Sequence, residues 1–204
     1  MDRTVPTAPL PARAAKASDD ASPEPPDERE RDCTLDLGAF APARRVGIWR
    51  ASVGDAYTPL LDAAAARRFS MRVEASRVGR LVTSRFAATA ASRAHGAPET
   101  DKGAGPFLKL RIHLRGASRI ACGGEEIRLA PGAVHVLDEG RGRVERFGDF
   151  ETLAVWVSHA DAGWRPGARP AVSSLPEDAP AGMILADAIR SLHAALPAAS
   201  HGEQ

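Results

Sequence analysis

The feature that most constrains this chain is a run of strict alternation at residues 108–115, where apolar and polar side chains take turns (LKLRIHLR). A period of two places alternate side chains on opposite faces of a β-strand and does not fit an amphipathic helix. The apolar positions are Leu108, Leu110, Ile112 and Leu114, and the polar positions are Lys109, Arg111, His113 and Arg115. We expect the apolar face to be buried and the basic face to meet solvent, because a register shift of one residue would bury the charges instead.

Further strands surround this run and are separated by glycine turns. The expected strands cover residues 69–73, 78–86, 88–94, 118–122, 125–129, 134–137, 144–147 and 151–157. Gly123-Gly124 and Pro131-Gly132 supply turn signals between them. Many short strands at regular spacing predict a mainly β fold, built as an antiparallel barrel or sandwich.

A helical period replaces the strand pattern on both sides of this region. Residues 44–53 place Val46, Trp49 and Val53 on one side of a short helix that would pack on the core. Near the end of the chain, apolar residues repeat at the spacing of a coiled-coil seam, and they are Leu185, Ile189, Leu192 and Leu196. Such a seam either packs on the chain's own barrel or pairs two chains, and the sequence leaves both open.

The chain divides into a barrel, a terminal helix and segments without a core pattern. Prolines and alanines dominate the first residues, which carry almost no large apolar side chains to offset the entropy of ordering. Prolines also interrupt a later connection. We expect a disordered tail at residues 1–36, a barrel at 37–162, an irregular connection at 163–180, a helix at 181–196 and a short tail at 197–204.

The composition excludes several classes of protein. Lys and Arg number 27 against 26 Asp and Glu, and the arginines are scattered among acids, as on a solvated surface. This balance argues against a free-standing nucleic-acid binder. No apolar run approaches the roughly 20 residues of a membrane-spanning helix, and no secretory signal is visible, so we expect a cytoplasmic protein without a membrane partner.

No motif for catalysis or cofactor binding is present. The chain lacks a G-x-S-x-G elbow, a phosphate-binding glycine loop and a C-x-x-C pair, so we expect no catalytic residue and no cofactor. His135 follows a turn in the order P-G-x-x-H, which cupin barrels use at their second motif. Cupin enzymes hold a metal with this histidine, an H-x-H pair and a carboxylate, whereas the earlier strand here offers His113 alone. Two imidazoles without a carboxylate make a poor metal site, so we expect no metal.

Three turn motifs follow one another in a fixed order: L-R-G at residues 114–116, L-A-P-G at 129–132 and L-D at 137–138. With the tryptophan-containing helix (VGIWR) before them and the helix after them, residues 46–196 resemble the N-terminal ligand-sensing domain of AraC/XylS-type transcriptional regulators. The family usually has an acidic residue after the proline-glycine pair, where this chain has Ala133. The resemblance implies a cupin-like antiparallel β-barrel with a short N-terminal helix and a C-terminal α-helix.

The same resemblance implies an effector-sensing and dimerisation domain that binds a small molecule in its barrel. The residues that would contact the effector are Trp49, Leu110, Ile112, Val134 and Val136. The terminal seam would join a homodimer, or a heterodimer with an intact regulator. Such regulators read DNA with a C-terminal pair of helix-turn-helix units, and this chain ends at Gln204, where the linker would begin. We therefore expect a truncated or split regulator that does not bind specific DNA sequences itself.

Two other functions stay open on the sequence alone. One is a small metal-dependent cupin enzyme, a dioxygenase or isomerase, that would use His113 and His135. The other is a structural interaction domain whose barrel binds nothing. A metal assay separates the enzyme from the sensor, and a helix-turn-helix reading frame immediately downstream would distinguish a split regulator from the structural domain.

Overall fold

Two antiparallel sheets form the body of the protein in a computed structural model, which describes residues 33–53, 57–78, 80–89, 91–95, 107–165 and 170–199. The seven-stranded sheet has the order β1 (Cys33–Asp36), β3 (Met71–Val78), β4 (Leu81–Ala88), β11 (Phe150–Ser158), β6 (Phe107–Arg115), β9 (Ala133–Asp138) and β12 (Val172–Pro176). The five-stranded sheet has the order β2 (Tyr57–Leu60), β5 (Ala91–His95), β10 (Arg143–Phe147), β7 (Ser118–Cys122) and β8 (Glu125–Leu129). The predicted mainly β, antiparallel fold is confirmed.

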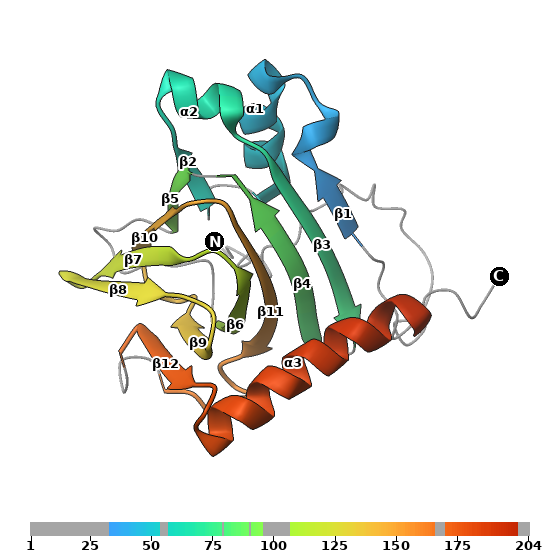
Figure 1. Ribbon diagram of the computed structural model, residues 1–204, viewed down its shortest axis with the longest axis vertical. Helices are drawn as coiled ribbons and strands as arrows, with labels where there is room; N and C mark the ends of the chain where they lie inside the picture. Colours follow the sequence, from blue (N-terminus) through green and yellow to red (C-terminus); the bar gives the residue numbers. More distant parts are fainter. Residues whose placement is uncertain are drawn as a thin grey trace, which may run out of the picture.

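Helices close one end of the two sheets and cover one face. A 3₁₀ turn, η1 (Leu37–Ala39), leads into α1 (Pro42–Val53), and α2 (Ala63–Arg68) follows β2. Asp62 caps α2, since its carboxylate accepts hydrogen bonds from the backbone N–H groups of Ala64 and Ala65. Figure 1 shows α1 and α2 together at one end of the sheets and the long helix α3 (Pro180–Ala199) crossing the larger sheet.

Several boundaries differ from those expected. Strand β1 lies within the segment expected to be a tail and pairs with β3, and β12 lies in the connection expected to be irregular and pairs with β9. Helix α3 is longer than the expected 181–196 at both ends. Strands β1 and β12 were missed because an edge strand of four or five residues carries too few alternations to be recognised. Residues 1–32 and 200–204, expected to be tails, lie outside the described residues.

The prediction that the basic face of β6 meets solvent was wrong, and the predicted burial of the apolar face holds for only part of it. Leu108 and Ile112 are buried as expected, but Leu114 is 41% exposed, whereas Arg111 is only 1% exposed. The whole basic face from Lys109 to His113 is buried. Both faces of β6 are covered, because the strand lies inside the larger sheet with α3 on one side and the smaller sheet on the other. Alternation therefore correctly predicts the strand but not which face turns into the barrel.

Helix α3 packs on the outer face of the larger sheet. Its buried residues Ala186 and Ile189 join a cluster with Ile112, Val134 and Leu153 of the sheet. The same cluster includes the partly buried seam residues Leu185 and Leu192. Three of the four predicted seam residues thus contact the chain's own barrel, and the side chain of Leu196 lies outside the described residues.

The L-x-G motif has a geometric cause in the turn between β6 and β7. Gly116 has a φ of 71°, a left-handed conformation that L side chains rarely adopt. A Cβ atom built at this position would lie 2.1 Å from the carbonyl oxygen of Asp149. The glycine therefore allows the chain to turn tightly against the β10–β11 connection, and thereby to pass from the larger sheet to the smaller one.

Because α3 packs on the sheet through its inward face, we expect that shortening a buried side chain on this face will destabilise the fold. Ile189→Ala should lower the free energy of unfolding by about 2–5 kcal/mol, the cost of a cavity in a packed core. Ile184→Ala, on the same helix but at a residue that is 67% exposed, should change it by about 0.5 kcal/mol or less. Urea unfolding followed by circular dichroism measures both, and equal losses would contradict the packing described.

Candidate functional site

The interior of the barrel contains two apolar clusters. The aromatic cluster lies beneath α1 and includes Trp49, Phe69, Phe86, Phe147 and Phe150. The aliphatic cluster consists of Ile120, Leu129, Leu137 and Val172. In the aromatic cluster, the edge of one ring meets the face of another, as between Trp49 and Phe86, whose centroids are 6.3 Å apart.

Polar side chains occupy the interior between these clusters. We call this set the interior polar cluster: Arg111 and His113 of β6, Ser118 of β7, His135 of β9 and Glu145 of β10. Its members come from both sheets, and each is at most 5% exposed. The His113 ring lies 5.8 Å from the Phe150 ring, and Glu145 pairs in register with Ile120. The cluster therefore adjoins both apolar groups.

An ion pair between the two sheets is the centre of the cluster. Arg111 Nη2 lies 2.7 Å from Glu145 Oε1, and both side chains are at most 2% exposed. The same nitrogen donates a 3.2 Å hydrogen bond to Ser118 Oγ. Within the described residues, Arg111 Nε has no hydrogen-bond partner. One donor of the guanidinium is thus left unused in the barrel interior.

The two histidines of the cluster are bound differently. His135 Nδ1 lies 2.9 Å from Ser174 Oγ, and its Nε2 lies within 3.2 Å of the backbone of Ala130, so both ring nitrogens have partners. His113 Nε2 lies 3.4 Å from Ser118 Oγ, while its Nδ1 has no hydrogen-bond partner among the described residues. The two rings meet edge to face at 5.5 Å.

Burial keeps both imidazoles neutral. Desolvation, with the adjacent charge of Arg111, lowers the pKa of His113 from its ordinary value to about 3. Desolvation also lowers the pKa of His135, although its hydrogen bond to Ala130 acts in the opposite direction. The only charges in the interior polar cluster at neutral pH are therefore those of the Arg111–Glu145 pair.

A second polar pair lies on the same interior face. Lys109 Nζ lies 4.4 Å from the centroid of the Trp156 ring, a cation–π distance, and Lys109 is 6% exposed. Trp156 is in register with Lys109, two residues beyond the partner of Arg111 on β11. The indole Nε1 of Trp156 is buried and has no hydrogen-bond partner within the described part of the chain.

The predicted ligand-binding residues lie elsewhere, except for Trp49. Leu110, Ile112 and Val134 belong to the group packed against α3, and Val136 shares their face because it pairs in register with Leu110. Their expected position inside the barrel was therefore wrong, while their role in binding stays a prediction. Trp49 does lie at the interior end, in the aromatic cluster.

Sequence reasoning missed Ser118 and Glu145. Glu145 lies in a strand (RVERF) that has no consistent apolar face, because Arg143 and Phe147 share its side. An acid at a buried strand position needs a buried base as a partner, and Arg111 is 34 positions earlier in the chain. The only local signal was an acid two residues from Phe147 on the same side of the strand, and that signal does not identify its partner.

Most of the side-chain atoms of the cluster that could coordinate a metal already have hydrogen-bond or ion-pair partners. Both nitrogens of His135 are hydrogen-bonded, and the carboxylate of Glu145 is paired with Arg111. In the part of the chain that the structure describes, no group of three or more His, Cys, Asp or Glu residues could hold a metal ion.

Comparison with known proteins identifies the family. The model of the AraC-binding-like domain matches residues 49–204, most of the chain. The chain belongs to the AraC-binding-like domain family. No curated protein matches it.

A solved structure supports the fold of this AraC-binding-like domain. The AraC-like transcriptional activator CuxR matches with a TM-score of 0.67 and 16% identity, over 82% of this chain and 62% of CuxR. The chain thus spans less than two thirds of that activator. The EutQ protein of Clostridium difficile matches with a TM-score of 0.37 and 11% identity, over 50% of this chain and 76% of EutQ. A deletion mutant of Bacillus subtilis oxalate decarboxylase matches with a TM-score of 0.33 and 12% identity, over 89% of this chain and 47% of that chain.

No helix in the described part of the AraC-binding-like domain is both long enough and apolar enough to cross a bilayer.

Removing the acid of the central ion pair should be costly. Glu145→Gln would leave the Arg111 guanidinium buried without a counter-charge, and we expect a loss of about 3–5 kcal/mol in the free energy of unfolding. The matched control is Glu74→Gln, which breaks an exposed pair with Arg72 and should cost about 1 kcal/mol or less. Chemical denaturation measures both, and similar losses in the two variants would contradict the role given to the buried pair.

Stability should also depend on pH through His113. The unfolded imidazole binds a proton below about pH 6.5, whereas the folded one stays neutral until about pH 3. The stabilisation is thus complete above pH 6.5 and is lost as the pH falls from 6.5 towards 3, with a slope of up to about 1.4 kcal/mol per pH unit. His113→Gln should flatten this slope in urea titrations at a series of pH values. An unchanged slope would mean that His113 is not the titrating group.

Proposed function

We propose that this domain senses a small organic effector, which it binds in the barrel beside the interior polar cluster. The observation that carries this proposal is a set of buried nitrogens without hydrogen-bond partners in the described residues: Arg111 Nε, His113 Nδ1 and Trp156 Nε1. A buried polar atom left unpaired costs about 1–3 kcal/mol, so such atoms call for a partner that a ligand can supply. Family membership supports a regulatory ligand-binding role.

The chemistry of these atoms limits the effector. Arg111 Nε and Trp156 Nε1 can only donate hydrogen bonds, and His113 Nδ1 donates or accepts according to its tautomer. The effector would therefore carry oxygen acceptors, such as carbonyl, hydroxyl or carboxylate groups. The aromatic and aliphatic clusters next to these atoms favour a molecule that also has an apolar part.

The domain would act as the sensing part of a cytoplasmic transcriptional regulator. This proposal rests on the family match and on the resemblance in fold to an AraC-like transcriptional activator.

Pairing of two chains, as a homodimer or as a heterodimer with an intact regulator, would need a surface other than the predicted seam, which is covered by the chain's own barrel. We propose the outward side of α3, where Ile184 is 67% exposed. Sedimentation equilibrium tests this, since Ile184→Asp should weaken a dimer and a wild-type monomer at all concentrations would contradict it.

We propose further that the domain binds its effector without metal or catalysis. The hydrogen bonds of both His135 nitrogens and the pairing of Glu145 with Arg111 support this, because they leave few free ligand atoms. Protein purified without chelator should contain far less than one equivalent of iron, manganese, nickel or zinc. A near-stoichiometric metal that is lost in His135→Ala would favour the cupin enzyme instead.

The sensing role is tested by ligand screening against the intact chain. Thermal shift with a panel of small carboxylates, sugars and aromatic acids should identify compounds that raise Tm, and calorimetry should give about one site per chain. Trp156→Phe keeps an aromatic ring, smaller than indole, but removes the unpaired N–H, so it should weaken binding by about tenfold, as one lost hydrogen bond does.

The matched control is Trp164→Phe. Its Nε1 already donates a 3.1 Å hydrogen bond to Asp138, so the substitution should leave effector affinity unchanged. His113→Gln should weaken binding together with Trp156→Phe. A hit whose affinity is the same in all three variants binds elsewhere and would contradict the interior site.

A further inference from the structure

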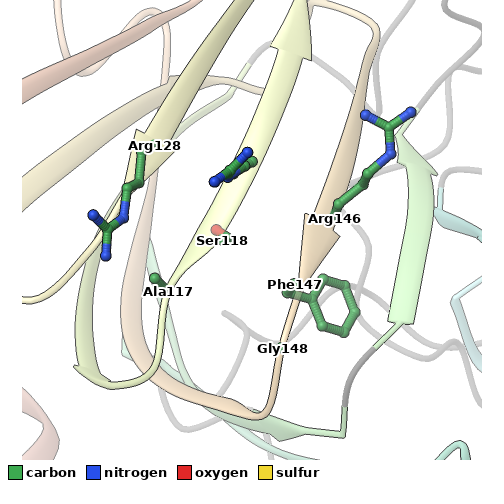
Figure 2. A pocket seen from close by; sticks show the side chains of 7 residues that line it. Ala117, Ser118, Arg128, Arg146, Phe147 and Gly148 are labelled. Atoms are coloured by element: carbon green, nitrogen blue, oxygen red, sulfur yellow. The ribbon is translucent and has the colours of Figure 1, made fainter.

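Three arginines form a row across the outer face of the five-stranded sheet. Arg119 of β7 is directly opposite Arg128 of β8 on one side and Arg146 of β10 on the other. We call these residues the arginine row. Figure 2 shows Arg128 and Arg146 on the strands to either side of β7. The row is exposed, with side-chain exposures of 66% for Arg119 and 63% for Arg146.

The charges of this row are not balanced by the described neighbours. Glu126 lies 3.3 Å from Arg119 and 3.7 Å from Arg146, so one carboxylate serves two guanidinium groups. Arg128 has no ion pair within the described residues. Like charges directly opposite on neighbouring strands repel and destabilise a sheet, and exposed ion pairs offset little of this. Sheet stability alone therefore does not explain the arrangement.

The row borders a hollow in the surface. An open depression of about 550 Å³ is lined by the three arginines together with Ala117, Ser118, Phe147 and Gly148. Figure 2 shows Ala117 and Gly148 at the ends of the strands that carry Arg119 and Arg146. A Cβ atom added to Gly148 would meet no atom within 4 Å. The volume falls in the range of small-molecule sites.

We propose that the arginine row binds a small molecule with at least two oxyanion groups, phosphates or carboxylates. Guanidinium groups form paired, charge-assisted hydrogen bonds with both kinds of oxyanion. Neighbouring strands are about 4.8 Å apart, so the row spans about 10 Å and can hold two such groups of one molecule. The three arginines lie on the outer face of the sheet and do not belong to the interior polar cluster, although Ser118 of that cluster also lines the depression.

Direct titration of the full chain tests the site. Sodium pyrophosphate and sodium succinate serve as the phosphate and carboxylate probes, with sodium chloride at matched ionic strength as the reference. Calorimetry should give about one site for at least one probe, and the stronger of the two identifies the oxyanion. Arg119→Gln should weaken that binding by about tenfold or more, the effect of lost charge-assisted hydrogen bonds.

Two further variants separate binding from folding. Arg72→Gln removes an arginine of similar exposure, 57%, from the larger sheet and should bind the probe as the wild type does. Gly148→Leu should block the depression without loss of fold, because its Cβ points into open space. Arg119→Gln should leave Tm unchanged or raise it, since it relieves repulsion on both sides of β7.

Each contrary result overturns the proposal. Equal effects of chloride and of both probes would indicate general screening of charge. Unaltered probe affinity in Arg119→Gln and Gly148→Leu would place the anion elsewhere. A fall of Tm in Arg119→Gln would give the row a structural role. Binding of a polyanion such as heparin but of neither small probe, lost in Arg119→Gln, would make the row a docking surface for a macromolecule.

Discussion

The ion pair between Arg111 and Glu145 joins the two sheets across the inside of the barrel, and the rest of the architecture is consistent with it. An unpaired charge in this position would cost several kcal/mol, so β6 and β10 must reach their registers together. With Arg111 turned inward, Ile112 must turn outward, which creates the apolar surface that α3 covers. One buried pair thus accounts for the position of the polar cluster and for the face on which the terminal helix packs.

Local patterns were sufficient to predict the central strands and several turns, but not the short strands β1, β2 and β12. The alternation at residues 108–115 correctly indicated a strand, and the L-x-G motif marked the turn where Gly116 has positive φ. Alternation could not tell which face turns inward, because β6 is covered on both sides and its basic face finds a counter-charge in another sheet. The coiled-coil spacing of α3 likewise predicted an apolar side of the helix but not its partner. That side packs on the barrel because Ile112 and Val134 face outward beneath it.

The candidate site was harder to predict from the sequence because the residues that pair in it are far apart in the chain. Arg111 was expected in solvent, and its acid lies in a strand without a consistent apolar face. The arginine row was hidden for the same reason, since its members are far apart in the chain and only the pairing of the strands aligns them. The same residue type therefore has two opposite environments here: a buried guanidinium with a matched acid and an exposed group with one shared carboxylate.

Strand β6 has a consequence for how binding and helix position could be linked. Successive residues of this strand alternate between the interior polar cluster and the contact with α3, so neither surface can be repacked without moving the other. A ligand that moved Arg111 would therefore also move Ile112 under the helix. Substitutions on the buried side of α3 would then tune the affinity of the interior for its ligand from a distance, without touching the ligand itself. By thermodynamic linkage, the ligand would tune the docking of the helix by the same factor.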